Sequence, residues 1–516
     1  MRKLVILLLL AAAGALVTTG CPAPGGDAKI ITVDNVDITA ITTNTTSITV
    51  TWTDPAGSGL DRIEVTCSDG ATETETDVAP GIQTCTIDSL STDTDYTISL
   101  TSVSTTETPS DGNHVIVTTT TSGSADHTTV STAAEFYAIR NNRDGDYLLT
   151  ADIDLSAYQA GTGWVPLATT ADRFTGIVNG NGHSITGLII NNPAGTYLGL
   201  FGSADGGNIC NIHIVDASIT GEIAASGFVG YMANSSTIAY CSFSGAINGN
   251  GRVGGIAGYN DTSTVIGCVS SGTVTSSGND TGGIVGYNDT GTVTLSSSTC
   301  AVDGVSTIGG LVGQNVFGTV SDSSAAGAVT GSGQGIGGLI GSSNGPVENC
   351  SATGSVTASG DYAGGLVGHN EDEISASYAT GAVSGANYAG GLVGFTAGAS
   401  SSVINSYARG SVTASVDYAG GLAGGLFANG TITNSYATGL VDCGGTNIGG
   451  LLGAISISTV TSSYWDTETS GMATSAAGTG LTIAGMKDQA NYTGWDFTTI
   501  WAIAGSTNNG YPHLRE

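Results

Sequence analysis

The sequence predicts an all-β protein in which a small N-terminal β-sandwich precedes a long β-solenoid. Three observations predict this fold. The chain of 516 residues contains 81 glycines but only 10% charged residues, a composition suited to short strands joined by tight turns. Residues 30–120 alternate apolar and polar residues between turn-forming residues, as strands of a half-buried sheet do. Residues 199–465 repeat a glycine-rich block every 26 to 30 residues, a period typical of solenoids.

The first 20 residues are predicted to be an export signal. Two basic residues precede an apolar run over residues 4–17, which is too short for a membrane-spanning helix. The small residues before Cys21 resemble the lipoprotein box of bacterial lipoproteins. This resemblance implies that a lipid on Cys21 anchors the mature protein to a membrane, at the cell surface or in the outer membrane, with residues 21–29 as a linker. Simple cleavage and secretion is the alternative.

Residues 30–120 are predicted to form the sandwich. Trp52 lies in an early strand, and Leu90 and Tyr96 precede a later one. This pattern resembles the fibronectin type III family, which implies that the Trp packs in the core and that the Tyr bonds nearby backbone. We expect a spacer, with a binding role as the alternative. Cys67 and Cys85 can pair as a disulfide in an exported protein. A flexible linker is expected over 121–127.

The repeated block is Gly-Gly-apolar-apolar-Gly. Its second position recurs ten times, with Leu198 and Ser226 in place of the first Gly in the two earliest copies. One unit alone could not bury its aliphatic residues, so we expect the units to stack as coils. The second positions are Gly199, Gly227, Gly255, Gly283, Gly310, Gly338, Gly365, Gly391, Gly421 and Gly450.

Blocks such as GGLVG at 309–313 and 364–368 resemble the GLUG-motif family of bacterial surface proteins. The resemblance implies a right-handed parallel β-helix of about ten coils, displayed at the cell surface. It also identifies residues 128–198 as an entry coil with an N-terminal cap, and 466–516 as a C-terminal cap segment. Some family members are parts of IgA-cleaving metalloproteases, but this sequence lacks their H-E-x-x-H motif, so that activity does not carry over.

One column of the aligned units accepts only Cys or Ser, which predicts a tight interior position where Cys acts as a small apolar residue. No His or second Cys stands at metal-ligand spacing, so no metal site is expected there. Cys210, Cys300 and Cys443 fall outside this column, and their roles stay open. The column is Cys241, Cys268, Ser296, Ser323, Cys350, Ser377, Ser406, Ser435 and Ser463.

Tyrosines recur in three other columns. We interpret them as exposed candidate contacts for a neutral glycan or a protein, because flat rings with hydroxyl tips suit such ligands. Stacked aromatic residues that only stabilise the solenoid are the alternative. The first column holds Tyr378, Tyr407, Tyr436 and Tyr464; the second holds Tyr362, Tyr388 and Tyr418; the third, in earlier coils, holds Tyr231, Tyr259 and Tyr287.

The charge excludes several ligands. The net charge is −31 with only 11 Lys and Arg, so nucleic acids and acidic glycans are not expected to bind. No cofactor is expected, although carboxylates at three places could hold Ca²⁺. These places are Glu371, Asp372 and Glu373 beside His369; the NDT loops at 260–262 and 288–290; and Asp144 with Asp146.

We therefore expect a surface-displayed rod for adhesion or binding, without catalysis. A polysaccharide lyase or hydrolase on a β-helix is the main alternative, but the solenoid offers few bases or paired carboxylates for such chemistry. Ice or mineral binding is a further alternative, suggested by a hydroxyl row that two acids interrupt. The row is Thr275, Thr330, Thr357, Ser384 and Thr413, and the acids are Asp303 and Asp442.

Overall fold

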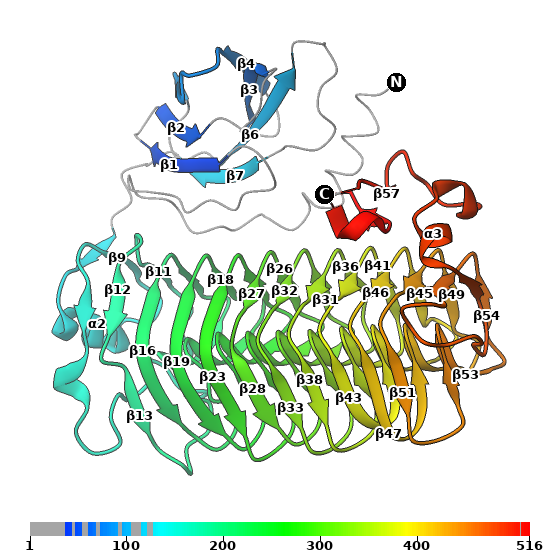
Figure 1. Ribbon diagram of the computed structural model, residues 1–516. Coiled ribbons are helices and arrows are strands. Elements are labelled where there is room, and N and C mark those ends of the chain that lie inside the picture. The colour runs from blue at the N-terminus through cyan, green and yellow to red at the C-terminus, as the bar shows by residue number, and fades with distance from the viewer. Residues whose placement is uncertain are drawn as a thin grey trace.

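The computed structural model places a β-sandwich before a β-solenoid of about 11 turns, as the sequence predicts (Figure 1). It describes residues 37–43, 47–53, 60–68, 73–90, 95–104, 115–120, 127–505 and 507–515. Cys21 and the side chains of Trp52 and Tyr96 lie outside the described set. The predictions made for these three residues therefore stay predictions.

The sandwich consists of two antiparallel sheets. Alternate residues of β3, among them Ile63 and Val65, are buried between them, as the period-2 pattern predicts. One sheet has the order β1-β2-β5, and the other β4-β3-β6-β7. The strands are β1 Asp37–Thr43, β2 Ser47–Thr53, β3 Leu60–Ser68, β4 Glu73–Val78, β5 Thr84–Asp88, β6 Asp95–Ser104 and β7 Val115–Thr120.

The expected disulfide between Cys67 and Cys85 is not formed. Both side chains are buried thiols, and burial raises the pKa of Cys85. Cys67 lies on β3 and Cys85 on β5, which belong to different sheets. The two thiols therefore belong to opposite sheets of the sandwich, and each stays a buried thiol in its own sheet.

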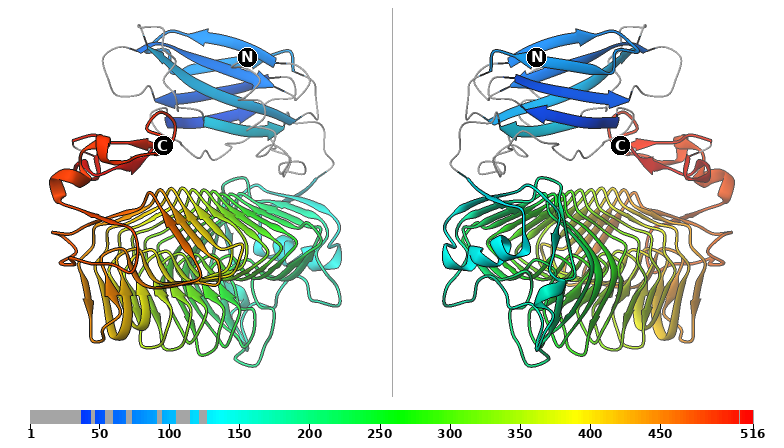
Figure 2. Two further views of the ribbon diagram at one scale, coloured as in Figure 1. Left: turned by 90° about the vertical axis from the view of Figure 1, so that its right-hand side faces the viewer. Right: turned by 90° about the vertical axis from the view of Figure 1, so that its left-hand side faces the viewer.

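The solenoid has three parallel sheets that run along its length, and Figure 2 shows the stacked coils from both ends. A 13-stranded sheet comprises β8 Thr128–Val130, β9 Asp146–Leu149, β11 Ile177–Asn179, β15 Asn208–Cys210, β18 Thr237–Ala239, β22 Thr264–Ile266, β26 Thr292–Thr294, β31 Thr319–Ser321, β36 Val347–Glu348, β41 Glu373–Ser375, β45 Ser402–Ile404, β49 Thr431–Thr433 and β54 Thr459–Thr461. A ten-stranded sheet comprises β14 Phe201–Asp205, β17 Val229–Ala233, β21 Ala257–Asp261, β25 Val285–Asp289, β30 Val312–Val316, β35 Ile340–Ser343, β40 Val367–Asn370, β44 Val393–Ala397, β48 Ala423–Phe427 and β53 Leu452–Ser456.

The third sheet has 26 strands, because most coils contribute two or three short strands to it. Its first half comprises β10 Ile153–Asp154, β12 Ser184–Thr186, β13 Ile189–Asn191, β16 His213–Thr220, β19 Ser242–Gly249, β20 Val253–Gly254, β23 Val269–Ser276, β24 Thr281–Gly282, β27 Ser297–Ser298, β28 Ala301–Gly304, β29 Ile308–Gly309, β32 Ser324–Ala325 and β33 Val329–Gly331. Its second half comprises β34 Ile336–Gly337, β37 Ser351–Ala352, β38 Val356–Ala358, β39 Ala363–Gly364, β42 Tyr378–Ala379, β43 Val383–Gly390, β46 Tyr407–Ala408, β47 Val412–Gly420, β50 Tyr436–Ala437, β51 Val441–Cys443, β52 Ile448–Gly449, β55 Tyr464–Asp466 and β56 Thr479–Leu481.

The glycine block is required by the close stacking of the coils. A Cβ atom on Gly338 would lie 2.0 Å from the carbonyl oxygen of Gly365, and one on Gly365 would lie 2.0 Å from that of Gly391. A Cβ on the first glycine, Gly364, would meet the Val367 carbonyl oxygen of its own block at 1.9 Å. No side chain fits at either position, so the block repeats because the backbone occupies that space.

The N-terminal end of the solenoid carries a short helical segment. Helix α2 (Ala133–Ala138) begins with a capping box between Thr132 and Glu135. It is followed by η1 (Ile139–Asn141), and η2 (Ser156–Tyr158) lies further on. Phe136 and Trp164 are buried with their ring centroids 6.0 Å apart, so aromatic packing closes the first coil.

The C-terminal segment covers more than the end of the solenoid. Residues 474–476 bond the last coil, through Gly450 N to Thr474 O and Ala476 N to Leu452 O. The chain then forms α3 (Ile483–Met486), η3 (Gln489–Asn491), β57 (Trp501–Ala502), η4 (Thr507–Gly510) and β58 (His513–Leu514). Figure 2 shows this part, in red, folded back along the edge of the coils. We call residues 483–515 the return segment.

Candidate functional site

The Cys/Ser column lies inside the solenoid, as predicted. Each of its nine side chains is at most 4% exposed. Each serine accepts a hydrogen bond from the backbone N–H of the preceding coil and donates one to the carbonyl two residues earlier in its own coil. For Ser406 these bonds are 3.2 Å, from Ser377 N, and 2.8 Å, to Ile404 O. The serines therefore join successive coils, which is a structural role.

The cysteines of this column are buried thiols, and burial raises the pKa of Cys268 and Cys350 to about 12 each. They are consequently neutral and unreactive at physiological pH. Among the cysteines whose roles the sequence left open, Cys210 is buried and disulfide-bonded, Cys300 is a buried thiol and Cys443 is a half-exposed thiol.

The NDT loops are part of the framework, not the calcium sites that they could have been. Asn260 and Asn288 are fully buried, and Asn260 Nδ2 donates to Asn288 Oδ1 over 2.6 Å. The neighbouring carboxylates, Asp261 and Asp289, accept the hydroxyls of Tyr231 and Tyr259 at 2.9 Å. The sequence analysis missed this asparagine ladder, whose signal was Asn at one position of consecutive units.

The other candidate calcium ligands do not gather either. Glu371 Oε1 lies 3.6 Å from His369 Nε2, whereas Asp372 Oδ1 accepts the backbone N–H of Glu373. Asp144 and Asp146 belong to no group of three candidate ligands in the described part of the chain. The one such group found there is Glu64, Glu75 and Asp77 in the sandwich, and Arg62 bridges two of its members, Glu64 and Asp77.

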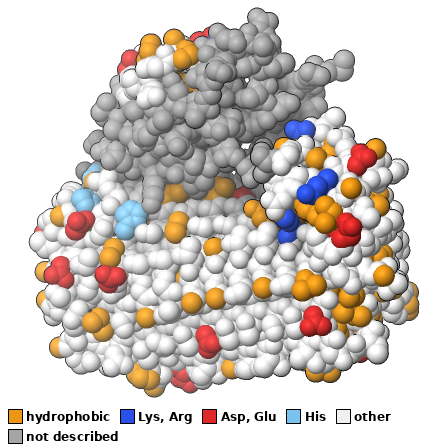
Figure 3. Space-filling model, in the orientation of Figure 1, with side chains coloured by type: hydrophobic (Ala, Val, Ile, Leu, Met, Phe, Trp, Pro, Cys, Tyr) orange, Lys and Arg blue, Asp and Glu red, His pale blue; other side chains and the backbone are white. Residues whose placement is uncertain are grey.

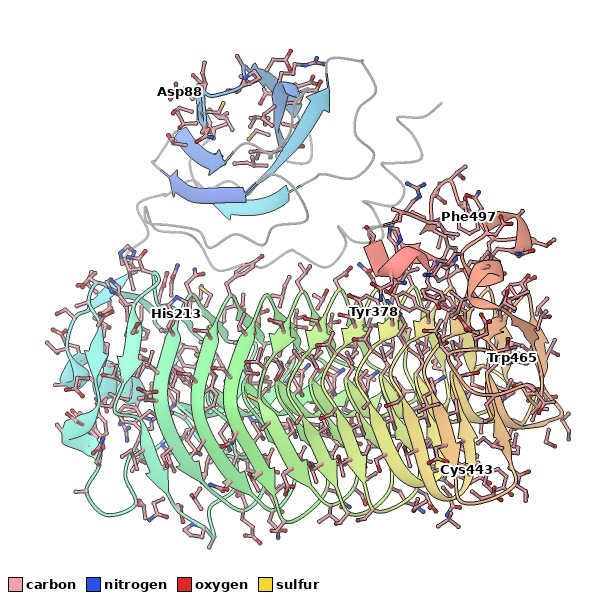
Figure 4. All side chains as sticks on the ribbon, in the orientation of Figure 1. Asp88, His213, Tyr378, Cys443, Trp465 and Phe497 are labelled. Atoms are coloured by element: carbon pink, nitrogen blue, oxygen red, sulfur yellow. The ribbon has the colours of Figure 1, made fainter. Side chains whose placement is uncertain are left out.

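The first tyrosine column is not the exposed ligand surface that we expected. Tyr407, Tyr436 and Tyr464 are 6%, 0% and 7% exposed, and only Tyr378 is half-exposed. The rings stack as predicted: Tyr378 and Tyr407 are 4.9 Å apart at 4°, and Tyr407 and Tyr436 are 5.1 Å apart at 8°. In Figure 4, Tyr378 lies at the edge of the solenoid beside the return segment that carries Phe497.

The return segment covers this column, which we call the tyrosine ladder (Tyr378, Tyr407, Tyr436 and Tyr464). Trp495, Trp501 and Tyr511 pack against it in one buried cluster. Tyr436 Oη donates to the Pro512 carbonyl over 2.6 Å, and burial raises its pKa well above the ordinary value. Repetition in the coils gave no sign of this cover, because the return segment is not repeated.

The second column is different, because Tyr362, Tyr388 and Tyr418 are half-exposed. Tyr388 and Tyr418 stack with centroids 4.3 Å apart at 5°. Three residues of the ten-stranded sheet join them through ring contacts of 4.8 to 6.0 Å. These are His369, Phe395 and Phe427, and we call the six residues the aromatic cluster. The sequence analysis missed these three, although His369 and Phe395 follow the glycine block as Tyr259 and Tyr287 do.

Polar side chains lie beside the aromatic cluster. Asn387 Nδ2 donates to Asp361 Oδ1 over 2.9 Å, and Asn447 Nδ2 donates to Asp417 Oδ2 over 2.6 Å. All four residues are half-exposed. Desolvation acts in the opposite direction, but hydrogen bonds from Asn447 and Tyr418 hold the pKa of Asp417 below its ordinary value. The carboxylate is therefore ionised at neutral pH and accepts hydrogen bonds.

The third column packs with the scarce arginines. Neighbouring rings in the series Tyr231, Tyr259 and Tyr287 have their centroids 5.1 to 5.2 Å apart. The guanidinium of Arg252 lies 4.6 Å from the Tyr259 ring centroid and 4.7 Å from that of Tyr287. Burial, with the Asp289 carboxylate, raises the pKa of Tyr259. The hydroxyls of Tyr231 and Tyr259 and the rings of Tyr259 and Tyr287 thus already have intramolecular partners.

The hydroxyl row is exposed and aligned on the 26-stranded sheet. Thr330 pairs with Thr357, and Asp303 interrupts the row between Thr275 and Thr330. Figure 3 shows this face of the solenoid with few charged side chains, whereas its Lys and Arg gather on the C-terminal part. Arg409 and Lys487 there lie 5.3 and 4.8 Å from the ring of Tyr511.

Sequence comparison with known proteins covers parts of the chain. The model of the fibronectin type III domain matches residues 32–115, and the GLUG motif matches 249–275, 332–357, 359–384 and 417–442. A protein of Evansella cellulosilytica named as a Gly-rich membrane protein is 42% identical over 98 residues, 18% of this chain and 11% of that protein. Halomucin of Haloquadratum walsbyi is 39% identical over 134 residues, 24% of this chain and 1% of that protein. This chain thus spans only a small part of both relatives.

Solved structures resemble the chain weakly. The match to a protein of Bacteroides ovatus described as an immunoglobulin A1 protease spans 76% of this chain and 93% of that protein's chain, with 18% identity and a TM-score of 0.30. The match to pectate lyase Pel3 of Pectobacterium carotovorum spans 71% of this chain and 85% of the lyase chain, with 11% identity and a TM-score of 0.15. Similarities this small support no argument about activity.

Within the described residues, no helix has the length and apolar character needed to cross a bilayer. The sequence matches and the geometry agree on the organisation of the chain. It carries an N-terminal fibronectin type III domain followed by GLUG motif repeats that build a β-solenoid of about 11 turns.

Proposed function

We propose that this chain is an exported bacterial surface protein whose solenoid is a non-catalytic rod for adhesion or binding. The observation that carries the proposal is the aromatic cluster. Six aromatic side chains from successive coils are held half-exposed beside four polar side chains. Large exposed aromatic groups mark contact surfaces, since a soluble protein gains nothing by leaving them in water.

The surface location is supported by the predicted export signal and by the printed names of the two relatives, a membrane protein and a halomucin. The lipid on Cys21 is part of the proposal. Metabolic labelling with an alkyne fatty acid tests it. We expect the intact chain to be labelled and a Cys21→Ser variant to be unlabelled and released into the medium.

Catalysis on polysaccharides is the competing function. A lyase needs a base near its substrate, and a hydrolase needs two converging carboxylates. Two carboxylates beside the aromatic cluster, those of Asp361 and Asp417, each accept a hydrogen bond from an asparagine in a neighbouring coil. Hydrogen bonds hold the pKa of Asp417 below its ordinary value, so this carboxylate suits binding better than proton donation.

The decisive experiment displays the full chain on cells that otherwise lack it. Adhesion to immobilised glycans and matrix proteins is measured together with sugar release from soluble polysaccharides. We expect adhesion without product. Release of reducing ends or unsaturated sugars would establish an enzyme instead, and thermal hysteresis without adhesion would favour ice binding by the hydroxyl row.

A further inference from the structure

Two tyrosine-rich groups that are built from the repeats are half-exposed at every member, the third column and the aromatic cluster. In the third column, Arg252 lies against the Tyr259 and Tyr287 rings, and carboxylates accept the Tyr231 and Tyr259 hydroxyls, so the aromatic cluster is the more available of the two. Its residues are half-exposed, whereas the return segment covers most of the tyrosine ladder. We propose that the aromatic cluster is a binding site for a neutral polysaccharide. This inference rests on the proposed function and names its site and its class of ligand.

The cluster begins abruptly along the solenoid. In the preceding coil, Gly335 occupies the turn position of Tyr362, and Ser342 pairs in register with His369. Gly335 has no side chain, so the coil before Tyr362 does not cover that side of its ring. The result is a step in the surface, from small residues to rings, at which the Tyr362 ring can stack against a sugar.

The cluster is long enough for several sugar units. Tyr362, Tyr388 and Tyr418 come from three consecutive coils, about 10 Å along the axis if each coil rises about 4.8 Å. Phe395 contacts Tyr362, Tyr388 and Phe427 at 4.8, 5.2 and 5.3 Å, so the rings form one continuous surface. A single sugar would cover only part of it, which favours an oligosaccharide or polysaccharide.

The polar groups beside the rings match sugar hydroxyls. Asp361 and Asp417 offer carboxylate oxygens as acceptors, and Asn387 and Asn447 offer amides that both donate and accept. Apolar faces of sugar rings stack on aromatic residues, while their hydroxyls bond to such groups.

Charge separates neutral from acidic ligands. The two carboxylates adjoin the rings, Glu371 lies beside His369, and the chain as a whole carries −31. The Lys and Arg of the solenoid's C-terminal part, Arg409 and Lys487, lie by Tyr511 in the return segment and not in the aromatic cluster. A polyanion such as polygalacturonate would be repelled, so the ligand is a neutral chain.

Calorimetric titration of the full chain with neutral hexasaccharides of glucose, mannose and galactose tests the proposal, with polygalacturonate as the acidic probe. We expect at least one neutral series to bind more tightly than the acidic probe. Tyr362→Ala and Phe395→Ala should each weaken that binding about tenfold, the usual effect of removing a central contact. Asn387→Ala should weaken it less, because the rings remain.

Tyr197→Ala is the matched control. Tyr197 is half-exposed, has the same positive φ as Tyr362, and occupies the equivalent turn in the first coil, several coils away. This variant should bind normally, and all four variants should keep the unfolding temperature of the parent chain. Sugar binding that survives Tyr362→Ala and Phe395→Ala would overturn this site while leaving the proposed function intact.

Three other results would also decide the matter. Adhesion to a protein partner together with no binding of any neutral sugar would overturn the ligand class but not the rod's binding role. Tighter binding of polygalacturonate than of neutral chains would overturn the charge argument. Failure of the full chain to adhere to any glycan or matrix protein would sink the proposed function itself.

Discussion

The tyrosine ladder and the aromatic cluster draw tyrosines from the same coils at the same interval, yet they have opposite surroundings. Tyr378 and Tyr388 are only ten residues apart in the sequence. From Tyr407 onward the ladder is buried in a cluster with aromatic residues of the return segment, among them Trp495 and Trp501. Tyr388 and Tyr418, in contrast, stay half-exposed. Both columns stack their rings within about 5 Å.

The difference shows that repetition decides which residues stack but not which stacks are covered. Stacking follows from the register, because Tyr378, Tyr407 and Tyr436 pair directly across parallel strands. Burial follows from 33 further residues, 483–515, that belong to no coil. A solenoid can therefore present one aromatic column to a ligand and use another as the docking surface for its own chain end.

Removing the return segment should have the largest effect on this contrast. A chain ending at Leu481 would expose the rings of Tyr407, Tyr436 and Tyr464. Losing their burial should cost the C-terminal coils about 5–9 kcal/mol, at about 1.5–3 kcal/mol for each large apolar side chain. Binding of a hydrophobic dye, and hydrogen exchange of β46 and β50, measure the change.

The aromatic cluster provides the control in the same molecule. Hydrogen exchange of β44, which carries Phe395, should change far less, because stability in a repeat protein is largely local. Equal loss of protection in β44 and β50 would mean that the return segment stabilises the whole solenoid, and the contrast between the two columns would then disappear.

Single substitutions sharpen the same comparison. Tyr436→Ala removes a fully buried ring and the hydrogen bond to Pro512, so we expect a loss of about 3–5 kcal/mol. Tyr388→Ala, in the half-exposed cluster, should cost about 1 kcal/mol or less. Chemical unfolding followed by tryptophan fluorescence reports on the return segment. Similar losses in both variants would contradict the assigned burial.

A serine pair tests the interior column at a smaller scale. Ser406→Ala leaves the N–H of Ser377 without its acceptor, which should cost about 1–3 kcal/mol. Ser384→Ala is the matched control: Ser384 is exposed on the hydroxyl row, so its loss should cost less than about 0.5 kcal/mol. Thermal unfolding measures both. A silent Ser406→Ala would mean that water replaces the lost bond.

Much of the fold follows from residues visible in the sequence. The glycine blocks predict the coils because no Cβ fits where they stack, as Gly365 shows. The Cys/Ser column predicts a tight interior because only small side chains recur there. Turns between the strands also use a residue suited to them, such as Asn405 with φ of 50°, since Asn tolerates the left-handed region.

The candidate site could be predicted only in part. Tyr362, Tyr388 and Tyr418 lie at a surface, but Tyr407, Tyr436 and Tyr464 do not, and local pattern cannot distinguish the two columns. Burial of the second set depends on Trp495 and Trp501, which lie 31 and 37 residues beyond Tyr464, the last member of the column. Long-range packing of a segment that occurs once leaves no periodic trace.

The smallest expected effect is a pH dependence of the aromatic cluster. Burial lowers the pKa of His369 below its ordinary value, with Glu371 acting in the opposite direction. As the pH falls through about 6.5, the unfolded chain takes up a proton on this residue before the folded chain does. The stability that neutral His369 contributes is therefore complete above that pH and declines below it.

Hydrogen exchange of β40 and β44 between pH 7.5 and 5 measures this effect, after correction for intrinsic exchange rates. We expect protection there to fall as the pH falls, and to fall less in a His369→Gln variant, which keeps the shape of the side chain but does not titrate. Protection of β50 in the tyrosine ladder is measured in a His513→Gln background, because burial also lowers the pKa of His513, which follows the Pro512 carbonyl that Tyr436 bonds. In that background the protection of β50 should stay constant, since the ladder rings contact no histidine among the described ring pairs. If β50 lost protection as much as β44, the pH effect would belong to the whole solenoid, and His369 would not distinguish the open column from the covered one.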